Sequence, residues 1–177
     1  MDVNDISSEL SELLDEDAKD RKAESVDVFA VQLRDRERLT RVKKLLDAGF
    51  IKTPQDEWCA AFIFHHGGGE KIDTPELMEN FKMAHDLARR SMIHGYEPAK
   101  WLYAASLDRI LLNQKKLQKY GTHYRKKKNG DWYLLPYDPS TTDEERAKYN
   151  VPALENAKKK AVLKKDDWNN RGVFKSS

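Results

Sequence analysis

The sequence has a single cysteine, Cys59, and no apolar run near the roughly 18 residues that a membrane span needs. One cysteine excludes an internal disulfide and is typical of a reducing compartment. Cys59 lies in the apolar run 58–64, which predicts a buried, unreactive thiol. The acidic N-terminal segment lacks the apolar core of a signal peptide, so we expect a cytoplasmic protein with no membrane partner.

The common catalytic motifs are also missing. The chain contains no Gly-x-Ser-x-Gly, no His-Glu-x-x-His and no phosphate-binding loop. The glycine run 67–69 follows a predicted helix instead of a strand, which indicates a linker and not a phosphate cradle. No cofactor and no bound metal is therefore expected. The net charge of +2 is close to balance, so no nucleic-acid partner is expected either.

The charges are abundant but segregated. Residues 1–24 are dominated by acids and form a lead-in that we interpret as a frayed or docking helix, with a faint apolar stripe at Ile6, Leu10, Leu13 and Leu14. This segment is a candidate surface for a protein partner. Basic runs occupy 125–128 and 158–165. We expect one helical domain over 25–164 and a loose tail over 165–177.

Apolar residues at helical spacing predict four core helices, at about 25–48, 53–66, 74–94 and 98–116. The second is apolar all round, which indicates a central buried helix. Short connections favour antiparallel neighbours. An Asn-Gly pair at 129–130, flanked by strand-forming residues, predicts a β-hairpin at about 122–136, and one or two short helices follow. The fold class is therefore mainly α: an antiparallel bundle of four core helices with a small C-terminal hairpin.

One ionisable residue interrupts the apolar stripe of each predicted core helix: Asp35, His66, His85 and Asp108. Asp108 shares a helical face with Trp101 and Leu112, where an unpaired carboxylate costs several kcal/mol. The helix then breaks near 120–122, so this loop can return to Asp108. The four side chains suggest a polar centre between the helices, which can be structural, ligand-binding or metal-binding.

Several motifs resemble a bacterial domain-of-unknown-function family. The family has an Asp-Arg pair on a helix, matched by Asp108-Arg109, and then Gln-(Lys/Arg)-(Tyr/Phe)-Gly-Thr-Gln, matched at 118–122. Its Ala-Ala…Ile-Phe-Gln-His-Gly and Ala-His…Leu-Ala segments are matched at 60–67 and 84–88. His65 and His123 stand where the family has Gln, which adds titratable groups. The resemblance implies a mainly helical fold with a shared polar centre, and it implies no established activity.

Three hypotheses about function follow. In the leading one, a buried pocket binds a small polar or peptide ligand and hydrolyses it with water. His66 or His85 acts as general base, Asp108 orients an imidazole, and Arg109 holds an anionic group. Besides Arg109, the pocket's ligand-binding residues are Asp35, Gln118, Tyr120, Thr122 and His123.

The second hypothesis is a non-catalytic protein-interaction module in which the polar centre is structural and the acidic lead-in or the basic hairpin binds a partner. The third is a metal-dependent phosphohydrolase. His66, His85-Asp86 and Asp108 resemble the His…His-Asp…Asp pattern of helical HD-type enzymes, although their separations are short for that family.

Overall fold

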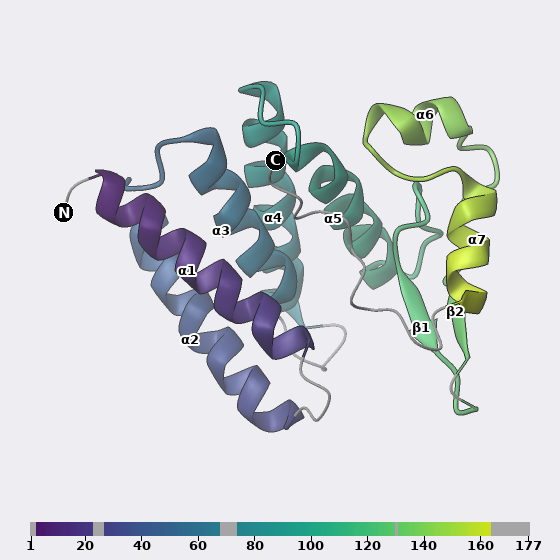
Figure 1. The fold of residues 1–177 in the computed structure, drawn as a ribbon, viewed down its shortest axis with the longest axis horizontal. Helices are drawn as coiled ribbons and strands as arrows, with labels where there is room; N and C mark the ends of the chain where they lie inside the picture. Colours follow the sequence, from purple (N-terminus) through teal and green to yellow (C-terminus); the bar gives the residue numbers. More distant parts are fainter. Residues whose placement is uncertain (1–2, 23–26, 68–73, 130, 164–177) are drawn as a thin grey trace.

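The computed structural model describes residues 3–22, 27–67, 74–129 and 131–163, and within these ranges the chain is mainly helical with one two-stranded sheet (Figure 1). The mainly α fold class with a C-terminal hairpin is confirmed. The predicted tail at 165–177, most of the glycine linker and Gly130 of the turn lie outside the described residues. In chain order the elements are α1 (Val3–Lys22), α2 (Val28–Asp47), α3 (Pro54–His66), α4 (Pro75–Ile93), α5 (Ala99–Asn113), β1 (Tyr124–Lys126), β2 (Trp132–Leu134), α6 (Asp143–Lys148) and α7 (Leu154–Leu163).

Helix α3 is the centre of the bundle, as its apolar sequence predicts. It contacts α1, α2, α4 and α5, and its residues from Asp56 to His65 are all buried. Thr53 caps its N-terminus in a capping box with Asp56, and Pro54 occupies the first turn. The Ser7 hydroxyl of α1 donates to the Asp56 carboxylate at 2.7 Å, so this cap also joins two helices.

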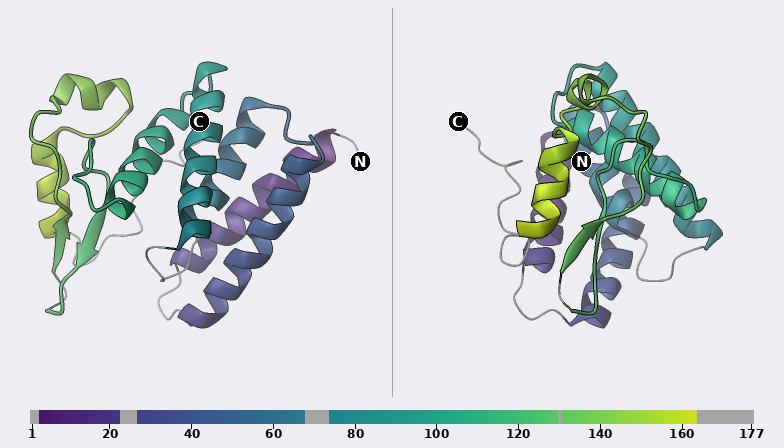
Figure 2. Two further views of the ribbon diagram at one scale, coloured as in Figure 1. Left: turned by 180° about the vertical axis from the view of Figure 1, so that it is seen from behind. Right: turned by 90° about the vertical axis from the view of Figure 1, so that its right-hand side faces the viewer.

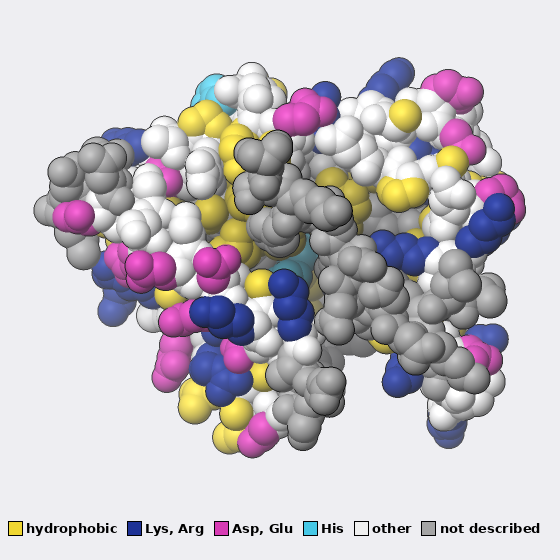
Figure 3. Space-filling view, viewed as in Figure 1, with side chains coloured by type: hydrophobic (Ala, Val, Ile, Leu, Met, Phe, Trp, Pro, Cys, Tyr) yellow, Lys and Arg dark blue, Asp and Glu magenta, His cyan; other side chains and the backbone are white. Residues whose placement is uncertain are grey.

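Residues 3–22 of the acidic lead-in form the helix α1, which packs on α3. Its apolar stripe is buried, with Ile6 1% and Leu10 0% exposed, while Asp5, Glu12 and Asp15 face outward. The lead-in therefore contributes to the same core as the predicted bundle helices α2 to α5. Acidic and basic side chains lie side by side over α1 and α2 in the space-filling view (Figure 3).

Helix α5 separates the bundle from the C-terminal part of the chain. The hairpin, α6 and α7 lie on the far side of α5 from α1 and α2 (Figures 1 and 2). β1 and β2 pair antiparallel with Arg125 opposite Tyr133, and α7 packs on β2. A small second core of Ala104, Tyr120 and Val151 joins this part to α5.

Helix α5 ends at Asn113, three residues before the predicted end, because Lys115 adopts a left-handed conformation with φ 60°. The following segment, 114–123, runs back along α5. No helix within the described ranges is long and apolar enough to cross a membrane.

Candidate functional site

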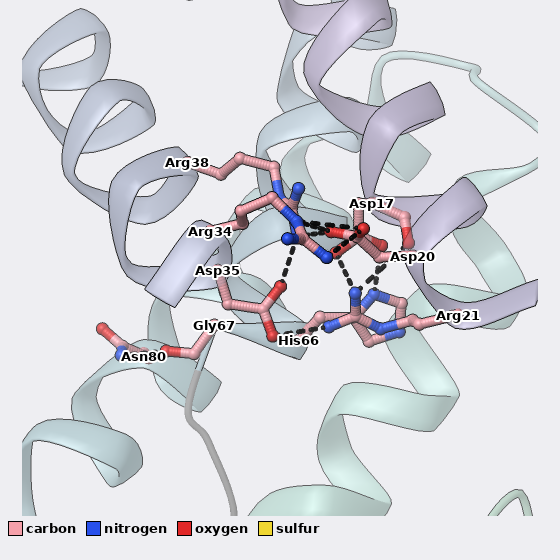
Figure 4. Close-up of polar contacts among 9 residues, drawn as sticks. All are labelled: Asp17, Asp20, Arg21, Arg34, Asp35, Arg38, His66, Gly67 and Asn80. Atoms are coloured by element: carbon pink, nitrogen blue, oxygen red, sulfur yellow. Dashed lines mark hydrogen bonds and ion pairs between the residues drawn. The ribbon is translucent and has the colours of Figure 1, made fainter. Parts of the chain in front are cut away.

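Two of the predicted polar residues, Asp35 and His66, lie in one cluster between α1, α2 and α3 (Figure 4). The Asp35 carboxylate accepts from Arg38 at 2.7 Å and from Arg21 at 3.0 Å. The Nδ1 of His66 lies 2.7 Å from the Asp17 carboxylate. Arg21 joins the two halves, because it also pairs with Asp17 at 2.6 Å. We call this set the helix cluster: Asp17, Asp20, Arg21, Arg34, Asp35, Arg38 and His66.

The charges of the helix cluster neutralise one another. Burial raises the pKa of Asp17, but His66, Arg21 and Arg38 outweigh burial and hold that pKa below its usual 3.8. Arg38, almost fully buried, bonds Asp20 at 2.8 Å as well as Asp35. The cluster therefore fastens α1 and α2 to the end of α3.

Asp17 and Arg21 were missed in the sequence analysis, although a signal was present. Asp17 continues the apolar stripe of Ile6, Leu10 and Leu14 at helical spacing. Like Asp35, Asp17 is therefore an acid in an apolar stripe, and such an acid needs a partner when it is buried.

Asp108 lies in a second, separate set of contacts. It is fully buried, and its two carboxylate oxygens accept the backbone N–H of Tyr120 at 2.8 Å, the backbone N–H of Thr122 at 3.0 Å and the Thr122 hydroxyl at 2.8 Å. Burial raises the pKa of Asp108, and these donors limit the rise. The loop thus returns to Asp108, as the sequence suggested.

Gln118 and His123 complete this arrangement. The Gln118 amide donates to the carbonyls of His123 and Leu135 and accepts the N–H of His123 at 2.9 Å. The Nε2 of His123 lies 2.7 Å from the carbonyl oxygen of Ala105. We call Asp108, Gln118, Thr122 and His123 the loop anchor.

Tyr120 and Gly121 of this loop contact the second core and Arg146. The Tyr120 ring is buried in the second core, and its carbonyl accepts from the buried Arg146 of α6. Gly121 has φ +69°, and a Cβ there would lie 3.1 Å from Arg146 Nη1. Arg146, another residue that the sequence analysis missed, therefore links α6 to the loop.

His85 belongs to neither set. Its Nδ1 lies 3.2 Å from the carbonyl oxygen of Tyr103 and 3.1 Å from the Ser106 hydroxyl, so it joins α4 to α5. Burial lowers the pKa of His85 and favours the neutral ring.

The ring of His65 lies between the helix cluster and the loop anchor. Its centroid is 5.4 Å from that of His66 and 5.6 Å from that of His123. The predicted polar residues therefore lie in separate groups. Asp35 and His66 belong to the helix cluster, and Asp108, Gln118, Thr122 and His123 form the loop anchor.

Arg109 is partly buried, and its guanidinium carbon lies 5.6 Å from the centre of the Phe81 ring. Its Nε is buried without a hydrogen-bond partner, as are those of Arg38 and Arg146. Burial lowers the pKa of Arg109, and the positive charge of Arg125 lowers it further. No hydrogen bond or ion pair joins the Arg109 side chain to another residue in the described ranges.

In the part of the chain that the structure describes, no three His, Cys, Asp or Glu side chains converge as metal ligands would. Cys59 is buried as predicted, and burial raises its pKa to about 12, so the thiol stays protonated at neutral pH.

Comparison with known proteins adds no relative. No protein-family model, no curated protein and no solved structure matches this chain.

Proposed function

We propose that the protein is a non-catalytic protein-interaction module whose polar residues are structural. The main support for this proposal is that both carboxylate oxygens of Asp108 already accept hydrogen bonds. One oxygen accepts from Tyr120 and the other from Thr122. A general base or an orienting carboxylate needs a lone pair directed at a reacting group or an imidazole. Asp108 instead holds a loop.

The two histidines support the same interpretation. His66 is joined to Asp17 in a cluster that fastens three helices, and His85 is joined to the Tyr103 carbonyl and Ser106. Both therefore have contacts that explain why a polar residue occupies an apolar helix face.

The partner-binding surface in this proposal is the basic hairpin. The cations from Arg125 to Lys128 are all exposed at the hairpin, whose tip extends beyond the end of α7 (Figure 1). Several basic side chains and an acidic one are visible around the hairpin tip in the space-filling view (Figure 3). A cationic surface of this kind attracts an acidic segment of a partner by charge complementarity.

The proposal is tested with a fluorescently labelled, glutamate-rich peptide, whose binding is measured by anisotropy. Replacing Lys126, Lys127 and Lys128 together by Gln is expected to weaken binding about tenfold, since each lost charge contact contributes a few tenths to 1 kcal/mol. The control replaces Arg36, Lys43 and Lys44 of α2, three equally exposed cations, by Gln and should leave the affinity unchanged.

Three outcomes would contradict this assignment. The peptide fails to bind the wild-type protein, both triple variants lose affinity equally, or a single-stranded oligonucleotide binds the hairpin more tightly than the peptide does. The last result would indicate that the hairpin binds nucleic acid instead of a protein partner.

A further inference from the structure

Three acidic side chains on the outward face of α1 are not neutralised within the described structure. Glu9, at the side of the helix, pairs with Arg41 of α2 at 2.5 Å. Glu12, Asp15 and Glu16 are exposed, and no ion pair within the described ranges includes them. Asp15 and Glu16 follow Glu12 by three and four residues, so the three acids share one side of the helix. We call Glu12, Asp15 and Glu16 the acidic ridge.

The basic hairpin carries charges of the opposite sign. Its cations, Arg125 to Lys128, are exposed and form no ion pair in the part of the chain that the structure describes. Asp131 is the one acid in the segment 122–136, and its carboxylate accepts from the Asn129 side chain at 2.8 Å. The hairpin therefore keeps an excess of positive charge. Repulsion between its cations is reduced when an acidic surface lies against them.

The acidic ridge and the hairpin lie on different sides of the molecule. Helix α1 packs on α2 and α3, whereas the hairpin lies on the far side of α5 from α1 (Figures 1 and 2). Because α5 and the bundle stand between them, the two surfaces cannot meet within one folded chain. A contact between them needs two molecules.

A second copy of the chain offers the hairpin an acidic surface that is already formed. Helix α1 is held in the core by Ile6 and Leu10, which are 1% and 0% exposed, and Ser7 joins it to Asp56 of α3. A surface held rigid before binding loses less conformational entropy than a flexible acidic segment does. The net charge of +2 also leaves little long-range repulsion between copies.

We propose that the acidic segment bound by the basic hairpin is the acidic ridge of a second copy of this chain. The contact joins two different surfaces, so it is heterologous, and each copy carries both of them. This assignment rests on the proposed function, because the same hairpin cations bind the acidic partner in both.

The first experiment measures self-association of the full chain by sedimentation velocity. Wild-type protein should associate as its concentration rises at about 20 mM salt, and it should be monomeric at about 0.5 M salt, because exposed charge pairs are screened. The glutamate-rich peptide should dissociate the assembly, since it competes for the hairpin. Replacing the hairpin lysines 126–128 together by Gln should weaken association about tenfold.

The second experiment exchanges the charges of the two surfaces. The hairpin reversal carries Lys126→Glu, Lys127→Glu and Lys128→Glu. The ridge reversal carries Glu12→Lys, Asp15→Lys and Glu16→Lys. Each variant alone should be monomeric where wild type associates, because like charges then face each other. An equal mixture should associate again, because each reversed surface meets one of opposite charge. Loss of folding cannot produce this rescue, and the exposed positions should leave each melting temperature near that of wild type.

Two control variants remove as many exposed charges elsewhere. One carries Arg36→Gln, Lys43→Gln and Lys44→Gln, and the other carries Glu37→Gln, Asp47→Asn and Glu76→Gln. Both should associate like wild type. An equal loss in these controls would mean that association follows overall charge, and it would overturn the assignment.

Three further outcomes separate this assignment from the proposed function. Wild-type protein that stays monomeric at low salt while the peptide binds the hairpin overturns the second copy as partner and leaves the proposed function standing. A mixture of the two reversals that stays monomeric also overturns the pairing of ridge and hairpin. If neither the peptide nor a second copy binds the hairpin, both the proposed function and the assigned partner are wrong.

Discussion

Asp108 illustrates how a single buried carboxylate can define the course of a loop. Its oxygens bind the backbone of residues that follow the end of α5, and the bonds to Tyr120 and Thr122 hold the segment 118–123 against that helix. The loop in turn places β1, because the strand begins directly after His123. The side chain thus determines where the hairpin lies.

Substituting Asp108 by Asn should reduce the free energy of unfolding by about 2–4 kcal/mol. The NH2 of Asn replaces one carboxylate oxygen and faces a hydrogen-bond donor, so the side chain cannot accept all three bonds. Urea denaturation measures the change. Thr122→Val removes only the hydroxyl bond and should cost about 1 kcal/mol. Asp47→Asn, at the exposed end of α2, is the control and should change stability little. If Asp108→Asn is as stable as this control, the loop anchor does not stabilise the fold.

His85 should make stability depend on pH. Burial lowers its pKa below the usual 6.5, so the unfolded chain binds a proton more readily than the folded protein does. Stability should therefore fall as the pH decreases below 6.5 toward the folded pKa. Denaturation measured between pH 7 and 5 should show this loss in the wild type and a smaller loss in His85→Gln. Equal slopes in the two proteins would contradict the prediction.

At the level of elements, α1 shows that an acidic segment can be a core helix. Its outward acids dominate the composition, but the inward stripe of Ile6, Leu10 and Leu14 packs on α3. The helix cluster then fastens its C-terminal half to α2 and α3 through Asp17 and Arg21. The outward acids do not prevent docking, because only one face of a helix is buried.

Leu10→Ala should cost about 2–5 kcal/mol of stability, since Leu10 is fully buried and its removal leaves a cavity. Leu13, only partly buried on the same helix, is the matched control, and Leu13→Ala should cost less. Thermal unfolding compares the two. If Leu10→Ala unfolds at the same temperature as Leu13→Ala, α1 does not form part of the cooperative core.

At the level of the whole molecule, the helix cluster should control stability in acid. Its interactions hold the pKa of Asp17 below 3.8, so the stabilisation is fully present above that pH and is lost as the pH falls through the folded pKa. The neighbouring Asp20 has its pKa lowered chiefly by Arg34 and Arg38 and should behave alike.

The prediction is that stability decreases as the pH falls below about 3.8, and that Asp17→Asn flattens this decrease while it lowers stability at pH 7. Circular dichroism during urea titrations at several pH values measures it. Glu12→Gln, an exposed acid on α1, provides the control with an unchanged slope. An Asp17→Asn protein with the wild-type acid slope would show that other groups cause the loss.

Local patterns in the sequence determined the elements. Thr53 and Thr74 cap α3 and α4, Gly49 follows α2 with positive φ, and the strand-forming residues that flank the Asn-Gly pair form β1 and β2. These features depend on neighbours within a few residues, so spacing alone reveals them. Spacing also indicated that Asp35 and Asp108 are buried acids in need of partners.

Only the tertiary structure decided which partners these acids have. Asp35 meets Arg21 of another helix, whereas Asp108 meets the loop that follows its own helix. Helical spacing specifies the face on which a side chain lies, but not which neighbour covers that face, because that depends on how the whole chain packs. For the same reason, the sequence predicted Arg109 to lie in a pocket, but only the fold shows that its guanidinium lies over the Phe81 ring.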